Sequence, residues 1–373
     1  MVRKLIIIYI IIGSLQVYNL SILGSIIRLF HLSAIALMVA IILFDIIYFK
    51  TKKPVLHFAK PIYLIFAAVF LSMFTAFFSF NQNFGISLYA QRDIYFYLFY
   101  FTLHALRIEK KDLMRLVIYF GLLYFLAYII QFIAFPGEIF DVTMREERGT
   151  VRIYLEGAGY AMLGYFMCLQ IFYTTNKLKY ILLSIIFFIP IVLFGARSGV
   201  STVLLGTIVQ LLLSKRVKSK VLIVFLVMLA LVPTIYFLQD VFLGIIKAQK
   251  LESAQGSENI RILAAQFFLT KLPPNTMAYI TGIGAPSERS SLGQITALMS
   301  DKYGFYLVDV GIIGNYVTYG VLFVFSVLLI VLKLMFTKVE ADMAFIKYFF
   351  FFEVFLMLPI AAGFAFSPPI ANL

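Results

Sequence analysis

Long apolar stretches recur along the chain and are separated by short polar connections. Their helical or uniformly apolar pattern predicts about eleven membrane-spanning helices, because one crossing takes about 20 apolar residues. The strict alternation over about ten residues that marks a membrane β-barrel strand is not seen. The predicted spans cover residues 5–24, 30–49, 61–80, 86–106, 113–134, 157–174, 180–195, 198–213, 221–238, 308–333 and 344–365.

Composition supports a membrane protein and excludes other classes. Of the 373 residues, 62% are hydrophobic and 13% are charged, and the mean hydropathy is +0.99. A soluble domain has about 45–50% apolar and about 25% charged residues, so a soluble or a disordered chain is excluded. We expect a single all-α polytopic membrane domain over residues 1–373, with about 11–12 spans. The first span is expected to be retained, because no signal-peptide cleavage site follows it.

Few residues are suited to a metal or redox site. The single cysteine, Cys168, lies in an apolar run, which excludes a disulfide framework and a thiolate metal site. The three histidines, His31, His57 and His104, argue against a histidine-rich metal centre. No carboxylate cluster has the spacing of a Mg²⁺ site. We therefore expect neither a metal nor a cofactor.

The basic residues indicate how the chain is oriented. Lysine-rich connections alternate with the others, and they hold 15 of the 19 lysines. By the positive-inside rule these connections are cytoplasmic, as is the N-terminus with Arg3 and Lys4. The net charge of +13 is thus assigned to topology and not to nucleic-acid binding. The outer side carries residues 135–156 and a long connection, residues 239–304.

Arginine has the opposite distribution. Arginine on the outer side works against the positive-inside orientation, and its planar fork binds phosphate or carboxylate through two hydrogen bonds. A single outer arginine could pair with an outer acid, but for the whole set we favour an anionic substrate at the outer face. Eight of the 12 arginines fall on that side: Arg28, Arg92, Arg145, Arg148, Arg152, Arg197, Arg261 and Arg289.

Two of these arginines are expected below the membrane surface. Residues 181–213 must cross twice with only 33 residues, so the turn at residues 195–199 is expected within the outer leaflet. A buried guanidinium is costly unless it is paired, which makes Arg197 a functional candidate; the alternative is a side chain that snorkels to the headgroups. Arg92 and Asp93 fall in the outer third of their span, where the pair either neutralises itself or takes part in function.

The two long outer segments supply further candidates. Segment 135–156 has the mixed charge of a solvated loop, but Arg152 precedes a glycine-containing helix start whose free N–H groups favour anions. Segment 239–304 is long for a connection and is expected to be a lid or half-site over the outer mouth. It is predicted to contain an amphipathic helix from Glu258 to Leu269 that ends before two prolines.

Three smaller features follow that helix. Gly282 and Gly284 are expected in a tight turn after a short extended stretch, and Arg289 lies at the tip of a polar loop. Asp309 falls in the first turns of the next span. An acid at a helix N-terminus is equally well explained as a partner of the helix dipole.

These ordered features resemble the bacterial O-antigen polymerase and O-antigen ligase superfamily, which includes the Wzy-type polymerases. The resemblance covers about residues 150–335 and rests on four motifs. The most specific is the turn of the short hairpin, here in a variant form with Ala-Arg-Ser. In chain order the motifs are Gly-Ala-Arg-Ser-Gly, Asn-Ile-Arg-Ile-Leu-Ala-Ala-Gln, Gly-Ile-Gly and Asp-Val-Gly-Ile-Ile-Gly.

The resemblance implies a GT-C-like helical fold and action on glycans linked to undecaprenyl pyrophosphate at the outer face of the bacterial cytoplasmic membrane. By position, Arg197 and Arg261 match the family's essential arginines, to which binding of the pyrophosphate is assigned. Ligases of the family typically carry a histidine in the long outer loop, and this chain has none after His104, which favours a polymerase. The implied partners are the lipid-linked oligosaccharide, the bilayer, and flippase and chain-length regulator proteins.

We therefore expect a metal-independent glycosyltransferase that joins lipid-linked repeat units. Two alternatives stay open: a ligase that transfers the glycan to another acceptor, and a flippase or transporter, which predicts inverted repeats or broken paired helices. Arg197 and Arg261 are expected to stabilise the negative charge of the pyrophosphate. The substrate-binding candidates are Arg152, Arg289, Arg92, Gly282 and Gly284. The carboxylates that could orient or deprotonate the attacking hydroxyl are Asp309, Glu258 and Glu288.

Overall fold

The computed structural model describes residues 2–24, 26–48, 56–147, 150–195, 197–213, 243 and 259–357. Over these residues the chain is mostly helical, with one antiparallel sheet of two short strands. The protein is an all-α membrane protein. Four of the described helices are long and apolar enough to cross a membrane: α2 (Ile26–Tyr48), α3 (Ala59–Phe80), α6 (Lys110–Ala134) and α15 (Ile312–Phe336).

Shorter elements complete the described chain. The other α-helices are α1 (Val2–Ser14), α4 (Phe84–Ala90), α5 (Leu98–Leu106), α7 (Ala158–Thr175), α8 (Leu178–Leu193), α9 (Arg197–Leu213), α12 (Ile260–Thr270), α13 (Thr276–Thr281), α14 (Ser291–Tyr303) and α16 (Ala344–Met357). The 3-10 helices are η1 (Gln16–Asn19), η2 (Ser21–Leu23), η3 (Arg92–Tyr97), η5 (Leu307–Val310) and η6 (Ala341–Met343). The strands are β1 (Met144–Glu147) and β2 (Thr150–Ile153).

The chain forms two compact units, and each is assembled from segments that are far apart in the sequence. Each unit has buried apolar clusters of its own. The first unit holds residues 1–31, 108–254 and 338–353, and the second holds residues 32–107, 255–337 and 354–373.

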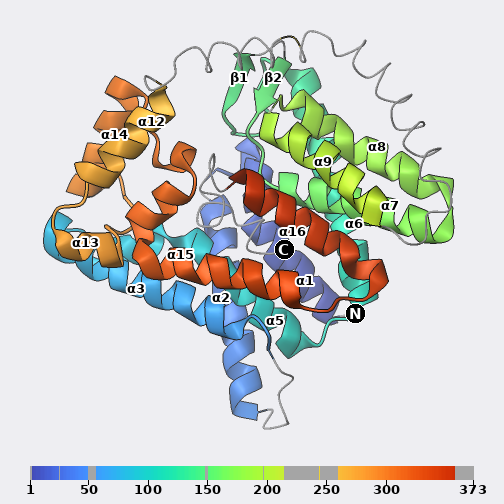
Figure 1. Cartoon of the computed structure of the whole chain (residues 1–373), viewed down its shortest axis with the longest axis horizontal. Helices are drawn as coiled ribbons and strands as arrows, with labels where there is room; N and C mark the ends of the chain where they lie inside the picture. Colours follow the sequence, from blue (N-terminus) through green and yellow to red (C-terminus); the bar gives the residue numbers. More distant parts are fainter. Residues whose placement is uncertain are drawn as a thin grey trace. The chain divides into compact units, whose positions relative to one another are not determined.

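In the first unit α7 packs against both α6 and α8 (Figure 1). Phe187 of α8 is fully buried, and glycines of the other two helices make room for its ring. A Cβ atom at Gly121 or at Gly164 would lie 2.9 Å from an atom of that ring. Small residues let membrane helices approach closely. These two glycines therefore set how closely α6 and α7 approach α8.

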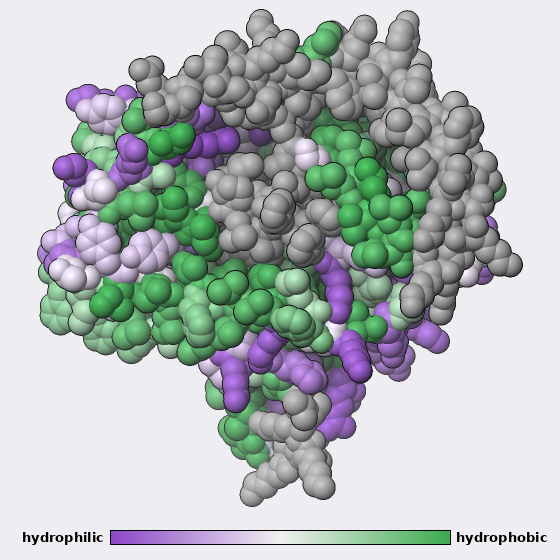
Figure 2. All heavy atoms as spheres, viewed as in Figure 1, coloured by the Kyte–Doolittle hydropathy of each residue, from purple (hydrophilic) through white to green (hydrophobic). Residues whose placement is uncertain are grey.

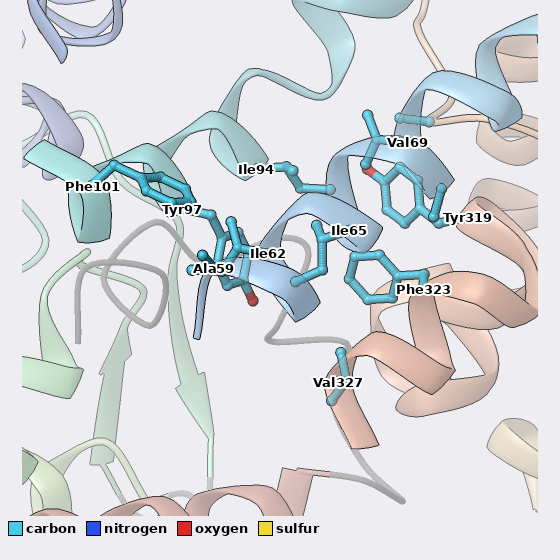
Figure 3. Close-up of a cluster of buried hydrophobic side chains, with 12 residues drawn as sticks. Ala59, Ile62, Ile65, Val69, Ile94, Tyr97, Phe101, Tyr319, Phe323 and Val327 are labelled. Atoms are coloured by element: carbon cyan, nitrogen blue, oxygen red, sulfur yellow. The ribbon is translucent and has the colours of Figure 1, made fainter. Parts of the chain in front are cut away.

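In the second unit α3 packs along α15, and apolar side chains fill the space between them. Figure 3 shows Ile65 and Val69 of α3 close to Phe323 and Tyr319 of α15, with Tyr97 of η3 in the same cluster. The rings of Tyr319 and Phe323 stack with their centroids 5.0 Å apart. This cluster holds the two long helices of the unit together.

The surface of the second unit differs between its helices. Large apolar side chains are exposed on α3 and α15, among them Phe78 and Phe325. Figure 2 shows this apolar surface, and it shows hydrophilic side chains among apolar ones over α12 and α14, where Ile262 and Leu298 are exposed. An apolar surface on helices long enough to span suits lipid. The unit therefore combines a helix pair suited to a membrane with a segment of mixed surface.

Most predicted spans coincide with described helices, and the exceptions have local causes. The predicted span 5–24 is wrong in extent, because α1 ends at Ser14 and residues 16–19 adopt left-handed φ values between 48° and 55°. The predicted span 86–106 is divided into α4, η3 and α5. Span 221–238 and the end of span 344–365 lie outside the described residues.

Two connecting segments also differ from expectation. The solvated loop expected over residues 135–156 contains the hairpin β1–β2, in which Arg145 pairs with Arg152. The extended stretch expected before Gly282 is the short helix α13. The amphipathic helix predicted from Glu258 to Leu269 is confirmed as α12, which is capped by Asn259.

Candidate functional site

Arg197 is the first residue of α9, directly after the turn that follows α8. Helix α8 has 16 residues, which at about 1.5 Å per residue give a length of about 24 Å, less than the hydrocarbon core of about 30 Å. Helix α9 is described as far as Leu213, where the described residues end. The position of this turn within the outer leaflet therefore stays a prediction.

The hairpin β1–β2 holds the end of α8. The Thr150 hydroxyl donates a hydrogen bond of 2.9 Å to the Leu193 carbonyl, and Arg152 Nε donates one of 2.9 Å to the Phe194 carbonyl. The last carbonyls of a helix have no partner within the helix. Two side chains of β2 therefore cap α8, and they fix the backbone just before Gly195, whose φ of 64° makes the turn.

The Arg152 side chain is 11% exposed and is surrounded by partners. Its Nη1 forms an ion pair with Glu147. Its guanidinium lies 4.7 Å from the ring centroid of Phe194 and 5.3 Å from that of Tyr154. Arg145 is directly opposite in the hairpin, and like charges there destabilise a strand pair. The observed contacts give Arg152 a positioning role, and contact with a substrate stays a prediction.

Arg261 and Asp309 lie on neighbouring elements of the second unit. Arg261 is in the first turn of α12, where its N–H donates 3.0 Å to the Asn259 side chain. Helix α12 packs on η5 through a shared apolar cluster that includes Phe268 and Leu307. Asp309 of η5 is exposed, and it precedes α15 rather than lying in its first turns. A carboxylate and a guanidinium are thus carried on one packed pair of elements.

Gly282 and Gly284 mark a close backbone approach. The Gly284 N–H donates 2.9 Å to the Thr318 carbonyl of α15, and the Gly282 N–H donates 2.9 Å to the Ala278 carbonyl. At Gly282 a Cβ atom would lie 2.4 Å from the Thr318 carbonyl oxygen. Helix α15 breaks opposite, at Gly320, where φ is 78°. These two N–H groups are used within the protein, so a role in substrate binding stays a prediction.

The remaining predicted residues are placed as follows. Arg92 is half-buried at the start of η3, where its Nη1 donates 3.3 Å to the Tyr89 carbonyl and its guanidinium lies 4.8 Å from the Tyr89 ring. Arg289 is exposed in the turn before α14. Glu258 lies outside the described residues. Arg152 and Arg197 belong to the first unit, and the other described candidates belong to the second.

Several residues that shape the surroundings of the candidate residues were not singled out from the sequence. Thr150, Glu147 and Phe194 complete the environment of Arg152, and Gly320 breaks α15. Only Gly320 carries a local signal, since a glycine inside a long apolar span marks a site of close packing. Within the described part of the chain, no group of three or more His, Cys, Asp or Glu side chains could hold a metal ion.

Comparison of the chain with protein-family models, with curated proteins and with solved structures finds no match.

Proposed function

We propose that the protein is a polysaccharide repeat-unit polymerase in the cytoplasmic membrane of a bacterium, with its N-terminus in the cytoplasm. Its substrates are oligosaccharides linked to undecaprenyl pyrophosphate. A hydroxyl of one glycan attacks the anomeric carbon of another; a C–O bond forms, the bond to pyrophosphate breaks, and the hydroxyl proton passes to a carboxylate. The lipid pyrophosphate leaves with the electron pair of the broken bond.

The observation that carries the proposal is the clamped turn before Arg197. The turn follows α8, which is shorter than a full membrane crossing, and Thr150 and Arg152 hold its backbone at the end of that helix. A helix N-terminus favours negative charge, and an arginine in its first position adds a full positive charge. These two features together suit a pyrophosphate that is attached to a lipid.

Charge stabilisation is the main chemical task, because pyrophosphate is a good leaving group. A fixed donor aimed at developing negative charge contributes about 3–4 kcal/mol. We assign this role to Arg197 and Arg261. Arg92 and Arg289 remain secondary candidates for binding the substrate. Asp309, which is exposed beside α12, is the described carboxylate that we favour for orienting the attacking hydroxyl.

One observation favours the flippase alternative. Broken helices are typical of transporters, and α15 is broken at Gly320. In this chain, however, the carbonyls of Val317 and Thr318 accept hydrogen bonds of 2.9 Å from the N–H groups of Ile283 and Gly284. Because the carbonyls at the break already accept hydrogen bonds from the protein's own backbone, we rank transport below polymerisation.

Reconstitution tests the proposal. The purified protein is placed in liposomes with a lipid-pyrophosphate-linked repeat unit, and the glycan products are separated on a gel. We expect a ladder spaced by one repeat unit, absent with Arg197→Ala and retained with Arg115→Ala, an exposed arginine of α6 outside the set of predicted outer arginines. A full ladder from Arg197→Ala would refute the assigned site. Passage of lipid-linked glycan across the bilayer without a ladder would favour the flippase.

A further inference from the structure

A groove lies in the second unit, between α14 and the chain at residues 305–308. Its volume is about 260 Å³. Pockets for drug-sized ligands measure about 300–1,000 Å³, so this groove has room for one group of about the size of a ring. Its lining includes the polar residues Glu288, Thr296 and Ser300 and the aromatic residues Phe305 and Tyr306.

The polar groups of the groove offer acceptors. The Thr296 hydroxyl donates its proton to the helix, with the Gly293 carbonyl oxygen 3.0 Å away, and the Ser300 hydroxyl donates 2.8 Å to the Ala297 carbonyl. Each hydroxyl therefore presents lone pairs to a ligand. An ionised Glu288 is likewise only an acceptor. A ligand rich in hydroxyl donors complements this set, whereas a phosphate or another anion is repelled by it.

The aromatic residues add an apolar face. Tyr306 is 41% exposed, and Phe305 packs with Tyr303 and Phe267 at centroid distances of 5.6 Å and 5.9 Å. An exposed ring beside hydrogen-bond acceptors matches a sugar, because a pyranose has an apolar face of C–H groups and a rim of hydroxyls. The small volume argues against a lipid chain.

We propose that this groove binds one sugar residue of the acceptor glycan. This inference rests on the proposed polymerase function and deepens it: the acceptor is held by hydroxyl recognition in the outer segment, separately from the arginines assigned to the pyrophosphate. Tyr306 packs on the sugar face, and Glu288 accepts hydrogen bonds from its hydroxyls. The groove thereby selects the acceptor by its sugar and not by its charge.

Binding to a lipid-free glycan tests the groove directly. The probe is an oligosaccharide of one to four repeat units, released by mild acid from the surface polysaccharide of the source cell, and its Kd is measured by calorimetry with the full-length protein in nanodiscs. Tyr306→Ala removes the stacking contact with the sugar, and Glu288→Gln removes the charge from the hydrogen bonds. We expect each change to raise the Kd about tenfold. Tyr279→Ala, an exposed tyrosine outside the groove, is the matched control and should bind as the wild type does.

The outcomes separate this inference from the proposed function. Unchanged binding in both groove variants, no binding by the wild type, or competition by inorganic pyrophosphate would each overturn the groove as a sugar site. In the ladder assay the same variants should raise the KM for the acceptor and leave the KM for the donor unchanged. A wild-type protein that binds the oligosaccharide in the groove but builds no ladder would refute the polymerase and leave the sugar site supported.

Discussion

Replacing Arg152 by alanine tests whether the hairpin β1–β2 fixes the turn before Arg197. The change removes the hydrogen bond from Nε to the Phe194 carbonyl, the ion pair with Glu147 and two contacts with aromatic rings. A hydrogen bond from a charged group is worth about 1.5–3 kcal/mol. The ring contacts add about 0.5–1 kcal/mol each, and the partly exposed ion pair adds less than about 1 kcal/mol.

Taken near the lower ends of these ranges, the contributions give about 3 kcal/mol, which corresponds to a shift of roughly 150-fold toward a released turn. Hydrogen exchange with mass spectrometry measures that shift in the peptide over residues 190–197. The Phe194 and Gly195 N–H groups donate to the Pro190 and Val192 carbonyls within this turn, so their exchange should accelerate. Exchange in Arg152→Ala that equals the wild type would refute the clamp.

A matched pair of variants sharpens this test. Arg145→Ala removes an exposed arginine directly opposite in the hairpin, and it should leave the exchange of residues 190–197 unchanged. Arg152→Lys keeps the positive charge near Glu147 but lacks the guanidinium fork, so it should fall between the wild type and Arg152→Ala. The order of the variants thus distinguishes loss of the fork from loss of charge.

Two further predictions concern glycine positions. Gly164→Ala brings a Cβ atom to 2.9 Å from Phe187, and overpacking of about 1–3 kcal/mol should lower the melting temperature in detergent, with partial recovery in the double variant Gly164→Ala/Phe187→Leu. An unchanged melting temperature would contradict the tight packing of α7 on α8. Gly320→Ala places a Cβ atom 2.1 Å from the Ile280 carbonyl oxygen, at a residue whose φ is 78°. Because of this clash with the backbone, we expect the peak of folded protein in size-exclusion chromatography to be mostly lost. Gly85→Ala, whose Cβ would meet its nearest atom at 3.5 Å, is the control that should elute as the wild type does.

The local sequence pattern was sufficient to predict an element that is long or has clear signals at both of its ends. The four long helices α2, α3, α6 and α15 coincide with predicted spans, because their length and hydropathy are properties of a continuous stretch. Helix α12 was predicted for a similar reason, since its polar start and the two prolines that follow it lie within a few residues of its ends.

Local pattern failed where distant residues decide the structure. The strand β2 reads as part of a charged loop, yet Thr150 and Arg152 hydrogen-bond to carbonyls 43 and 42 residues away along the chain. The segment after α13 is fixed by hydrogen bonds to a helix that breaks at Gly320. Neither the periodicity of a segment nor its charge indicates which distant backbone groups will be left without partners.

The sequence by itself thus determined that the chain is a helical membrane protein, because the length of apolar helix that a crossing needs is set by the bilayer alone. It also singled out Arg197, Arg261 and Arg152 by their charge and position. The tertiary structure decided what surrounds these residues: a carbonyl, a carboxylate and two rings for Arg152, and the exposed Asp309 on the element that packs against the helix of Arg261. The physical reason is that the partners of a charged group are chosen by packing between remote segments, which no local pattern specifies.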